Sequence, residues 1–244
     1  MNFLKPKFWD KDQISFFSIF LFPFSLCFKL INLSRSIFVK KNKFSIPIIC
    51  VGNIYLGGTG KTPLSIELFS ILKKLNKNPA FIRKKYKNYQ DEIDLLSNTG
   101  TTYEDKTRKN ALDLAIKNSI DVAILDDGFQ DFSIKKDLSI ICFNEKQWVG
   151  NNFVMPAGPL RENLSALNRA HFAIINGSKN IHMEKKIFEN NKLIKIFYTK
   201  YIPENIGEFK NKKIISFAGI GNPNNFFNLL RENNINLLEK ISFP

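Results

Sequence analysis

The residues with the clearest chemical potential form a glycine-rich stretch, VGNIYLGGTGKTPL, that passes from an apolar run into a helix-like pattern. Glycines at such a junction let backbone N–H groups curl around phosphates, while a lysine reaches the outer phosphates and the next hydroxyl binds magnesium. Lys61 and Thr62 would have these two roles. The stretch therefore predicts a phosphate-binding loop that consists of Tyr55, Leu56, Gly57, Gly58, Thr59, Gly60, Lys61 and Thr62.

This loop departs from the G-x-x-x-x-G-K-[ST] pattern at one position. The first glycine of the pattern would fall on Tyr55, and Gly57 and Gly58 are the residues that could compensate. A glycine-rich turn with an incidental lysine is the alternative interpretation. The apolar run before the loop and the helical pattern after it favour the phosphate-binding interpretation.

Two adjacent carboxylates end another apolar run, in VAILDDGFQD. An acid at the end of a buried strand beside a phosphate-binding loop commonly holds magnesium in P-loop enzymes. We therefore expect Asp126 and Asp127 to lie near Thr62 across the sheet. One acid would help to hold the metal, directly or through water, and the other would orient the loop or the acceptor. Solvated loop acids without a role in chemistry are the alternative.

A third cluster lies in GNNFVMPAGPLREN, where Gly and Pro residues bend the chain after a strand-like run. Arg161 could clamp a phosphate there and Glu162 could complete a magnesium shell, although exposed Arg-Glu pairs are more often structural. No Asn-Lys-x-Asp tetrad for guanine is present, and the nearest string is NGSK at 176–179. The expected cofactors are therefore ATP, in preference to GTP, and Mg²⁺.

Composition limits the class of protein and the kind of site. The chain has 244 residues, of which 44% are hydrophobic and 24% charged, as in soluble globular proteins. Its three separated cysteines indicate a reducing compartment, and its two histidines exclude a histidine-rich metal centre. The net charge of +14 indicates an anionic partner unless it reflects a coding bias. Nucleic acid is the least favoured partner, because no RNA- or DNA-binding motif is present.

Residues 1–32 are expected to form a membrane-associating helix. An uncharged run, ISFFSIFLFPFSLCF at 14–28, lies between two lysine-containing flanks. A transmembrane helix needs roughly 20 apolar residues, and Pro23 is expected to break the hydrogen-bond ladder within the run. We therefore predict a helix that lies on an anionic membrane surface, with Trp9 and the Phe side chains dipping inward. A buried N-terminal helix is the alternative.

The remaining chain alternates between short apolar runs and helix-like stretches, which indicates strands buried on both faces of a parallel sheet. We expect an α/β fold of the P-loop NTPase type over residues 33–200, a mostly parallel sheet with helices on both faces. Residues 201–244 are expected to begin a smaller C-terminal α/β domain, incomplete in this sequence because it ends on a bare strand. The expected strands are 46–53, 79–84, 121–127, 138–143, 171–177 and 193–199, and the expected helices include 63–75 and 108–118.

Taken in order, VGNIYLGGTGKTP, LDDGFQ, PAGPLRE and FAGIGNPNNFF resemble the tetraacyldisaccharide 4'-kinase family, the lipid A 4'-kinases of Gram-negative bacteria. The resemblance extends over nearly the whole chain. It implies an ATP-dependent kinase that phosphorylates the 4'-hydroxyl of a tetraacyl glucosamine disaccharide 1-phosphate. It also implies a peripheral protein at the cytoplasmic face of the inner membrane, whose partners are the lipid and an anionic membrane surface, with no nucleic acid and no obligate protein partner.

The resemblance assigns roles to individual residues. Asp91 matches the acid of the family's Gly-Asp-Glu motif and would accept the proton of the sugar hydroxyl. Gln130 matches the glutamine of its Asp-Asp-Gly-x-Gln segment. The predicted catalytic residues are thus Asp91, Lys61, Asp127 and Arg161, and the predicted metal ligands are Thr62, Asp126, Asp127 and Glu162.

The chain also departs from the family pattern. Gln90 replaces the glycine before Asp91, Asp131 replaces the usual histidine, and RKKY at 83–86 stands where Ser-Arg-Gly-Tyr is expected. The family's Asp-His pair would follow Pro244. A P-loop ATPase that drives a partner protein, with water as the acceptor, is the alternative function.

Overall fold

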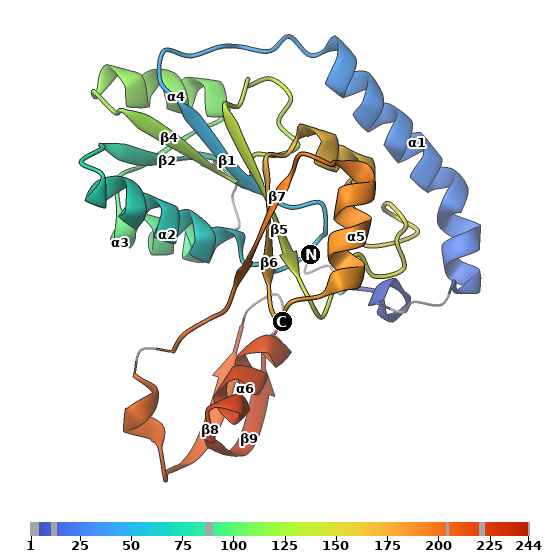
Figure 1. The fold of residues 1–244 in the computed structure, drawn as a ribbon, viewed down its shortest axis with the longest axis vertical. Helices are drawn as coiled ribbons and strands as arrows, with labels where there is room; N and C mark the ends of the chain where they lie inside the picture. The colour runs from blue at the N-terminus through green and yellow to red at the C-terminus, as the bar shows by residue number, and fades with distance from the viewer. Residues whose placement is uncertain (1–4, 11–13, 86–89, 204, 220–222, 244) are drawn as a thin grey trace.

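The computed structural model describes residues 5–10, 14–85, 90–203, 205–219 and 223–243, without the side chains of residues 90–92. Figure 1 shows a large twisted sheet with helices on both faces, a long helix along one side and a small C-terminal unit. The architecture is therefore α/β, as the short apolar runs predict.

Seven parallel strands form the large sheet, in the order β3-β2-β4-β1-β5-β6-β7. Six of them coincide closely with the predicted strands. The edge strand β3 is absent from the sequence prediction, because its TYED sequence is polar and its residues are half-buried. The strands are β1 (Ile48–Gly52), β2 (Pro79–Lys84), β3 (Thr102–Asp105), β4 (Val122–Asp126), β5 (Leu138–Asn144), β6 (Phe172–Asn176) and β7 (Lys195–Thr199).

The two faces of the sheet pack against different helices. Alternate strand residues point to opposite faces, so Val51 packs with Phe69 and Leu96 on one face. Its neighbour Cys50 packs on the other face, in the cluster that contains Ala111. The predicted covering of both faces is thus confirmed. The elements involved are α2 (Lys61–Lys74) and α3 (Gln90–Thr99) on the first face, and α4 (Arg108–Lys117), the 3₁₀ turn η2 (Leu164–Arg169) and α5 (Ile181–Asn190) on the second.

The N-terminal helix α1 (Phe16–Phe38) is longer than the uncharged run from which it is predicted. Pro23 lies inside the helix, so the expected break there is wrong. With 23 residues and a mean hydropathy of 1.8, α1 is long and apolar enough to cross a membrane by length and composition, which corrects the expectation that it is too short. The helix begins after Ser15, whose hydroxyl accepts from the backbone N–H of Phe17 at 3.1 Å.

After β7 the chain leaves the large sheet. Two further strands form a separate parallel pair, and one helix packs against them with Phe227 buried. The expected order of strand, helix and strand is confirmed. The domain divisions at residues 32 and 200 stay predictions, while α1 continues to Phe38 and β7 ends at Thr199. The remaining elements are η1 (Lys7–Asp10), η3 (Ile206–Phe209), β8 (Lys213–Ala218), α6 (Pro223–Glu232) and β9 (Asn236–Ser242).

Candidate active site

The predicted phosphate-binding loop connects β1 to α2. Gly57 has a φ of 144° and Gly60 a φ of 91°, a backbone region that glycine enters without steric cost. The side-chain amide of Asn53 donates to the carbonyl of Gly57 at 3.2 Å and to the hydroxyl of Thr59 at 3.0 Å. Gly60 caps α2, so the free N–H groups of the first helical turn, which begins at Lys61, lie at the loop. This arrangement suits an anion at the helix N-terminus.

Tyr55, the residue at the departure from the P-loop pattern, is a packing residue. It is fully buried, and its hydroxyl donates to Asp10 of η1 at 2.7 Å. Burial, together with this hydrogen bond, raises the pKa of Tyr55. The next residue, Leu56, donates from its backbone to the carbonyl of Pro159 at 2.8 Å. The loop is therefore held against both the N-terminal segment and the Pro-rich segment near residue 160.

Asp126 ends β4, the strand beside β1, and its carboxyl is almost completely buried with 1% exposed. Ser65 of α2 donates to it at 3.0 Å, and the Arg83 guanidinium lies 3.9 Å away. Burial raises the pKa of Asp126 above its ordinary value, against the opposing charges of Arg83 and Lys61. This acid ties β4 to the helix that begins at the phosphate-binding loop.

Asp127 differs from its neighbour because it faces the loop and is 32% exposed. Lys61 lies 3.9 Å from its Oδ1, and Arg161 donates to the same oxygen at 2.8 Å. Burial alone would raise the pKa of Asp127, but Lys61 and Arg161 hold it below its ordinary value. The residue has a φ of 53°, which a non-glycine residue rarely adopts. The site thus keeps an ionised carboxylate between two cations.

Gln130 and Glu162 continue this network away from the loop. The Gln130 side chain donates to the Asn53 carbonyl at 2.9 Å and to Glu162 at 3.1 Å. Its oxygen accepts from Arg161 at 3.4 Å. Glu162 accepts from Arg169 through both oxygens, at 2.9 and 2.8 Å. Segments from three parts of the chain therefore meet here in one hydrogen-bonded cluster.

Comparison with known proteins shows the family to which the chain belongs. The family model described as Tetraacyldisaccharide-1-P 4'-kinase matches residues 17–105 and 91–244. A tetraacyldisaccharide 4'-kinase of Pelagibacter ubique (strain HTCC1062) is 44% identical over 250 residues, which cover 100% of this chain and 78% of the relative. That of Rickettsia bellii (strain OSU 85-389) is 32% identical over 263 residues, covering 100% and 80%. The chain belongs to the tetraacyldisaccharide 4'-kinase family.

A solved member of the tetraacyldisaccharide 4'-kinase family has the same architecture. The "apo" form of LpxK from Aquifex aeolicus, crystallised in complex with ATP, matches with a TM-score of 0.73 and 26% identity. The match covers 93% of this chain and 82% of that chain. The expectations of a P-loop NTPase-type fold and of a kinase are thereby confirmed, and the kinase is supported over the ATPase that drives a partner.

In this tetraacyldisaccharide 4'-kinase the structure brings Lys61, Asp127 and Arg161 together, with Asp126 directly behind them. Thr62 lies in the first turn of α2 and is half-buried. Asp91 lies in the first turn of α3, and its side chain is outside the described residues. The structure therefore brings together the residues predicted for the centre of the site, and their functions, like that of the predicted base, stay predictions.

Arg108 is a site residue that the sequence patterns do not single out for chemistry. It begins α4 and is buried beneath the acidic turn, where it donates to the Asp127 carbonyl at 2.8 Å and to that of Asp126 at 3.4 Å. Its other nitrogen lies 3.4 Å from Asp131. A guanidinium that binds two carbonyls stabilises the unusual backbone at Asp127. The family resemblance includes Arg108 without giving it a function, and the neighbouring residues do not indicate its contact with the acidic turn.

The donor set fits magnesium. Around the loop the described residues offer hydroxyl and carboxylate oxygens, which are the ligands that Mg²⁺ prefers. The number of these oxygens is small, which suits an ion that keeps several waters and binds phosphate oxygens. Among these described residues no group of three or more His, Cys, Asp or Glu is arranged to hold a metal alone. An ion held by Thr62 and an acid would therefore be completed by the nucleotide.

Proposed function

We propose that this chain transfers the γ-phosphoryl group of ATP to the 4'-hydroxyl of a tetraacyl disaccharide 1-phosphate at a membrane surface. The observation that carries the proposal is the placement of Asp127 between Lys61 and Arg161 at the phosphate-binding loop. Phosphoryl transfer depends mainly on positioning and on neutralising phosphate charge. Two fixed cations beside an ionised carboxylate at a helix N-terminus meet these needs.

Each residue has a distinct part in this proposal. The backbone N–H groups of 57–62 and the Lys61 ammonium bind the phosphates, and Arg161 neutralises charge on the transferred group. Asp127 holds both cations in place. Asp91 is proposed to accept the proton of the sugar hydroxyl, as the family resemblance implies.

Magnesium is the proposed second cofactor. Thr62, Asp126 and Asp127 would hold it, and Glu162 is a predicted ligand as well, although both of its oxygens accept from Arg169. When bound, the ion would neutralise negative charge on the nucleotide phosphates. The buried Asp126, fixed by Ser65, keeps β4 and α2 in register around that position.

The membrane association is proposed from how α1 packs. The hydroxyl of Ser25 binds the backbone of Val154 and Ala157, and Phe22 lies edge-on to Phe153. Asn32 donates to the Arg161 carbonyl at 3.2 Å. Because these residues share one side of the helix, α1 is attached lengthwise to the globular part, and its other sides expose large apolar side chains. A helix attached in this way lies along a membrane rather than across it.

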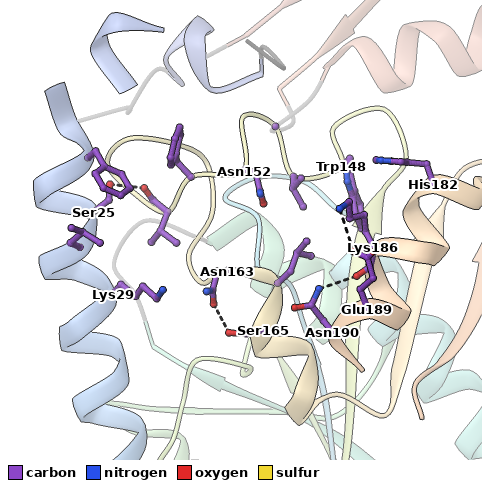
Figure 2. Close-up of a pocket in the computed structure, with 17 residues that line it drawn as sticks. Ser25, Lys29, Trp148, Asn152, Asn163, Ser165, His182, Lys186, Glu189 and Asn190 are labelled. Atoms are coloured by element: carbon purple, nitrogen blue, oxygen red, sulfur yellow. Dashed lines mark hydrogen bonds and ion pairs between the residues drawn. The ribbon is translucent and has the colours of Figure 1, made fainter. Parts of the chain in front are cut away.

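A cavity beside α1 is a proposed entrance for the lipid. It has a volume of about 620 Å³ and apolar walls that include Leu26, Phe153 and Val154. Figure 2 shows Ser25 and Lys29 of α1 on one side of it, and Lys186 of α5 on the opposite side. Such a cavity suits apolar chains with an anionic group at its rim. Asn163 also lines it, close in the chain to Arg161, so a lipid held here would lie next to the catalytic cluster.

The test is transfer of labelled γ-phosphate from ATP to a tetraacyl disaccharide 1-phosphate in anionic vesicles. We expect Lys61→Ala to abolish the transfer, while Lys74→Ala, a matched change at the exposed end of the same helix, leaves it unchanged. ATP hydrolysis that is unaffected by the lipid would contradict the proposal. Near-normal transfer by Lys61→Ala would refute the role of the phosphate-binding loop.

Membrane association needs a separate variant, because deleting residues 1–32 would also remove the contact between Asp10 and Tyr55. Replacing exposed Phe20, Phe24 and Leu30 by Ser leaves the packing residues in place. We expect this variant to bind anionic vesicles more weakly and to raise KM for the lipid more than KM for ATP. Unchanged vesicle binding by the folded variant would show that α1 is not the membrane-binding element.

A further inference from the structure

Arg169 lies at the end of η2, outside the phosphate-binding loop, and contacts two loops of the active site. Its guanidinium donates to both oxygens of Glu162, at 2.9 and 2.8 Å. The same group lies over the rings of Phe129, at 4.6 Å, and Phe132, at 4.9 Å. The two rings follow Asp127 in the chain and Glu162 follows Arg161. Arg169 therefore joins the segment that carries one proposed catalytic residue to the segment that carries the other.

The contact with Glu162 is one of two that fix the orientation of the Gln130 amide. Glu162 is 9% exposed, and its Oε1 accepts from Gln130 at 3.1 Å. The same Gln130 nitrogen donates to the Asn53 carbonyl at 2.9 Å. An amide group has two donor hydrogens, and both are used here, so the amide oxygen must point the other way. It points toward Arg161, 3.4 Å from its Nη1.

The last contact in this series joins Arg161 to Asp127, the acid at the phosphate-binding loop. The Arg161 nitrogen that approaches Gln130 is the one that donates to Asp127 at 2.8 Å. If Glu162 turned away, the Asn53 carbonyl alone would hold the Gln130 amide, which could then rotate more easily and present its NH₂ group to the guanidinium. That arrangement places donor against donor and would displace Arg161 from Asp127.

We propose that Arg169 is a positioning residue for phosphoryl transfer, which acts through Glu162 and Gln130 on Arg161 and Asp127. The proposal rests on the functions assigned above to Arg161 and Asp127. Arginine suits this position because its Nη2 donates to both carboxylate oxygens while the planar guanidinium stacks on the two rings. Lysine would keep the charge but lose the planar group that stacks on the two rings.

The experiment compares steady-state transfer of labelled phosphate by Arg169→Met, Arg169→Lys, Glu162→Gln and the double variant Arg169→Met/Glu162→Gln. We expect Arg169→Met to lower kcat by about 10- to 100-fold, the usual scale for partners that orient a reacting group, while KM for ATP changes much less. Arg169→Lys should recover part of the loss. Arg169 and Glu162 act through the same series of contacts, which we call the relay. The kcat of the double variant should therefore be no lower than that of the slower single variant.

Arg231→Met, the same change on the exposed part of α6, is the control and should keep the wild-type kcat. Arg161→Met separates the relay from the function on which it rests. If Arg161→Met turns over normally, the assignment of Arg161 is wrong. If Arg161→Met is inactive but Arg169→Met keeps its kcat, the relay alone is wrong.

Two further outcomes would overturn the proposal. Losses that multiply in the double variant would show that Arg169 and Glu162 act independently. Should Arg169→Met fail to fold, as judged by circular dichroism, the folded Arg169→Gln decides, because it also removes the charge, and a wild-type kcat in that variant excludes the positioning function.

Discussion

Replacing Arg108 by methionine tests how the acidic turn is supported from below. Methionine has a flexible stem that can fill much of the same space, but it removes the guanidinium that donates to the Asp127 carbonyl at 2.8 Å and to the Asp126 carbonyl at 3.4 Å. The change also removes the ion pair with Asp131. We expect a less stable protein and a displaced Asp127, because the left-handed backbone at that residue would lose its support.

The size of the effect follows from burial. The Arg108 side chain is 8% exposed and that of Asp131 20%, so water replaces the lost partners poorly. Hydrogen bonds to charged groups are worth about 1.5–3 kcal/mol, and breaking a buried ion pair costs about 3–5 kcal/mol. Asp131 keeps the hydroxyl of Ser133 as a donor at 2.6 Å, which places the cost at the lower end. We therefore expect a loss of about 2–3 kcal/mol in the free energy of unfolding.

The assay is urea unfolding followed by intrinsic fluorescence, with kcat measured on the same preparation. Arg108→Lys is the matched variant, and it should lose less stability because it retains the charge but not the fork. We expect Arg108→Met to lower kcat by at least about 10-fold where the protein is still folded. A change below about 0.5 kcal/mol together with a normal kcat would refute the view that Arg108 holds the turn.

Three further predictions concern the same site. Gly60→Ala should destabilise the protein by about 1 kcal/mol or more and raise KM for ATP, because the φ of 91° disfavours alanine and a Cβ would lie 3.1 Å from the Tyr201 hydroxyl. Gly207→Ala is its control, since it lies outside the loop and no described atom lies within 4 Å of a Cβ there, and equal KM values in both variants would contradict the prediction. Asp127→Asn tests pH dependence: the lowered pKa of Asp127 stabilises the folded state above the ordinary value of 3.8, and this stabilisation is lost as the pH falls through the lower folded-state pKa. Urea midpoints of the wild type should therefore fall more steeply in acid than those of the variant, and parallel profiles would exclude an ionised, paired Asp127. Tyr55→Phe should reduce stability by about 1 kcal/mol through loss of the hydrogen bond to Asp10, as measured by urea unfolding against Tyr103→Phe, and an unchanged midpoint would show that this contact does not hold the loop.

The sequence alone determines the parts of the molecule that depend on neighbouring residues. Short apolar runs predict six of the seven strands in the large sheet, because strands buried on both faces need apolar residues throughout. The glycines at 57 and 60 and the acids at 126 and 127 are likewise recognisable from a few adjacent letters. The polar edge strand β3 is not predicted in this way, because a half-buried strand at the edge of a sheet does not need a run of apolar residues.

Only the tertiary structure decides which distant side chains share a contact. Asp126 and Asp127 have the same sequence signal, yet one is buried against Ser65 while the other faces Lys61 and Arg161. Their pKa values are shifted in opposite directions because the first is removed from water and the second is surrounded by cations. The continuation of α1 past Pro23 also depends on the tertiary structure, because contacts with residues 153–161 hold the helix in place. Local patterns specify backbone and burial, whereas pairings between segments far apart in the chain depend on where the whole fold places them.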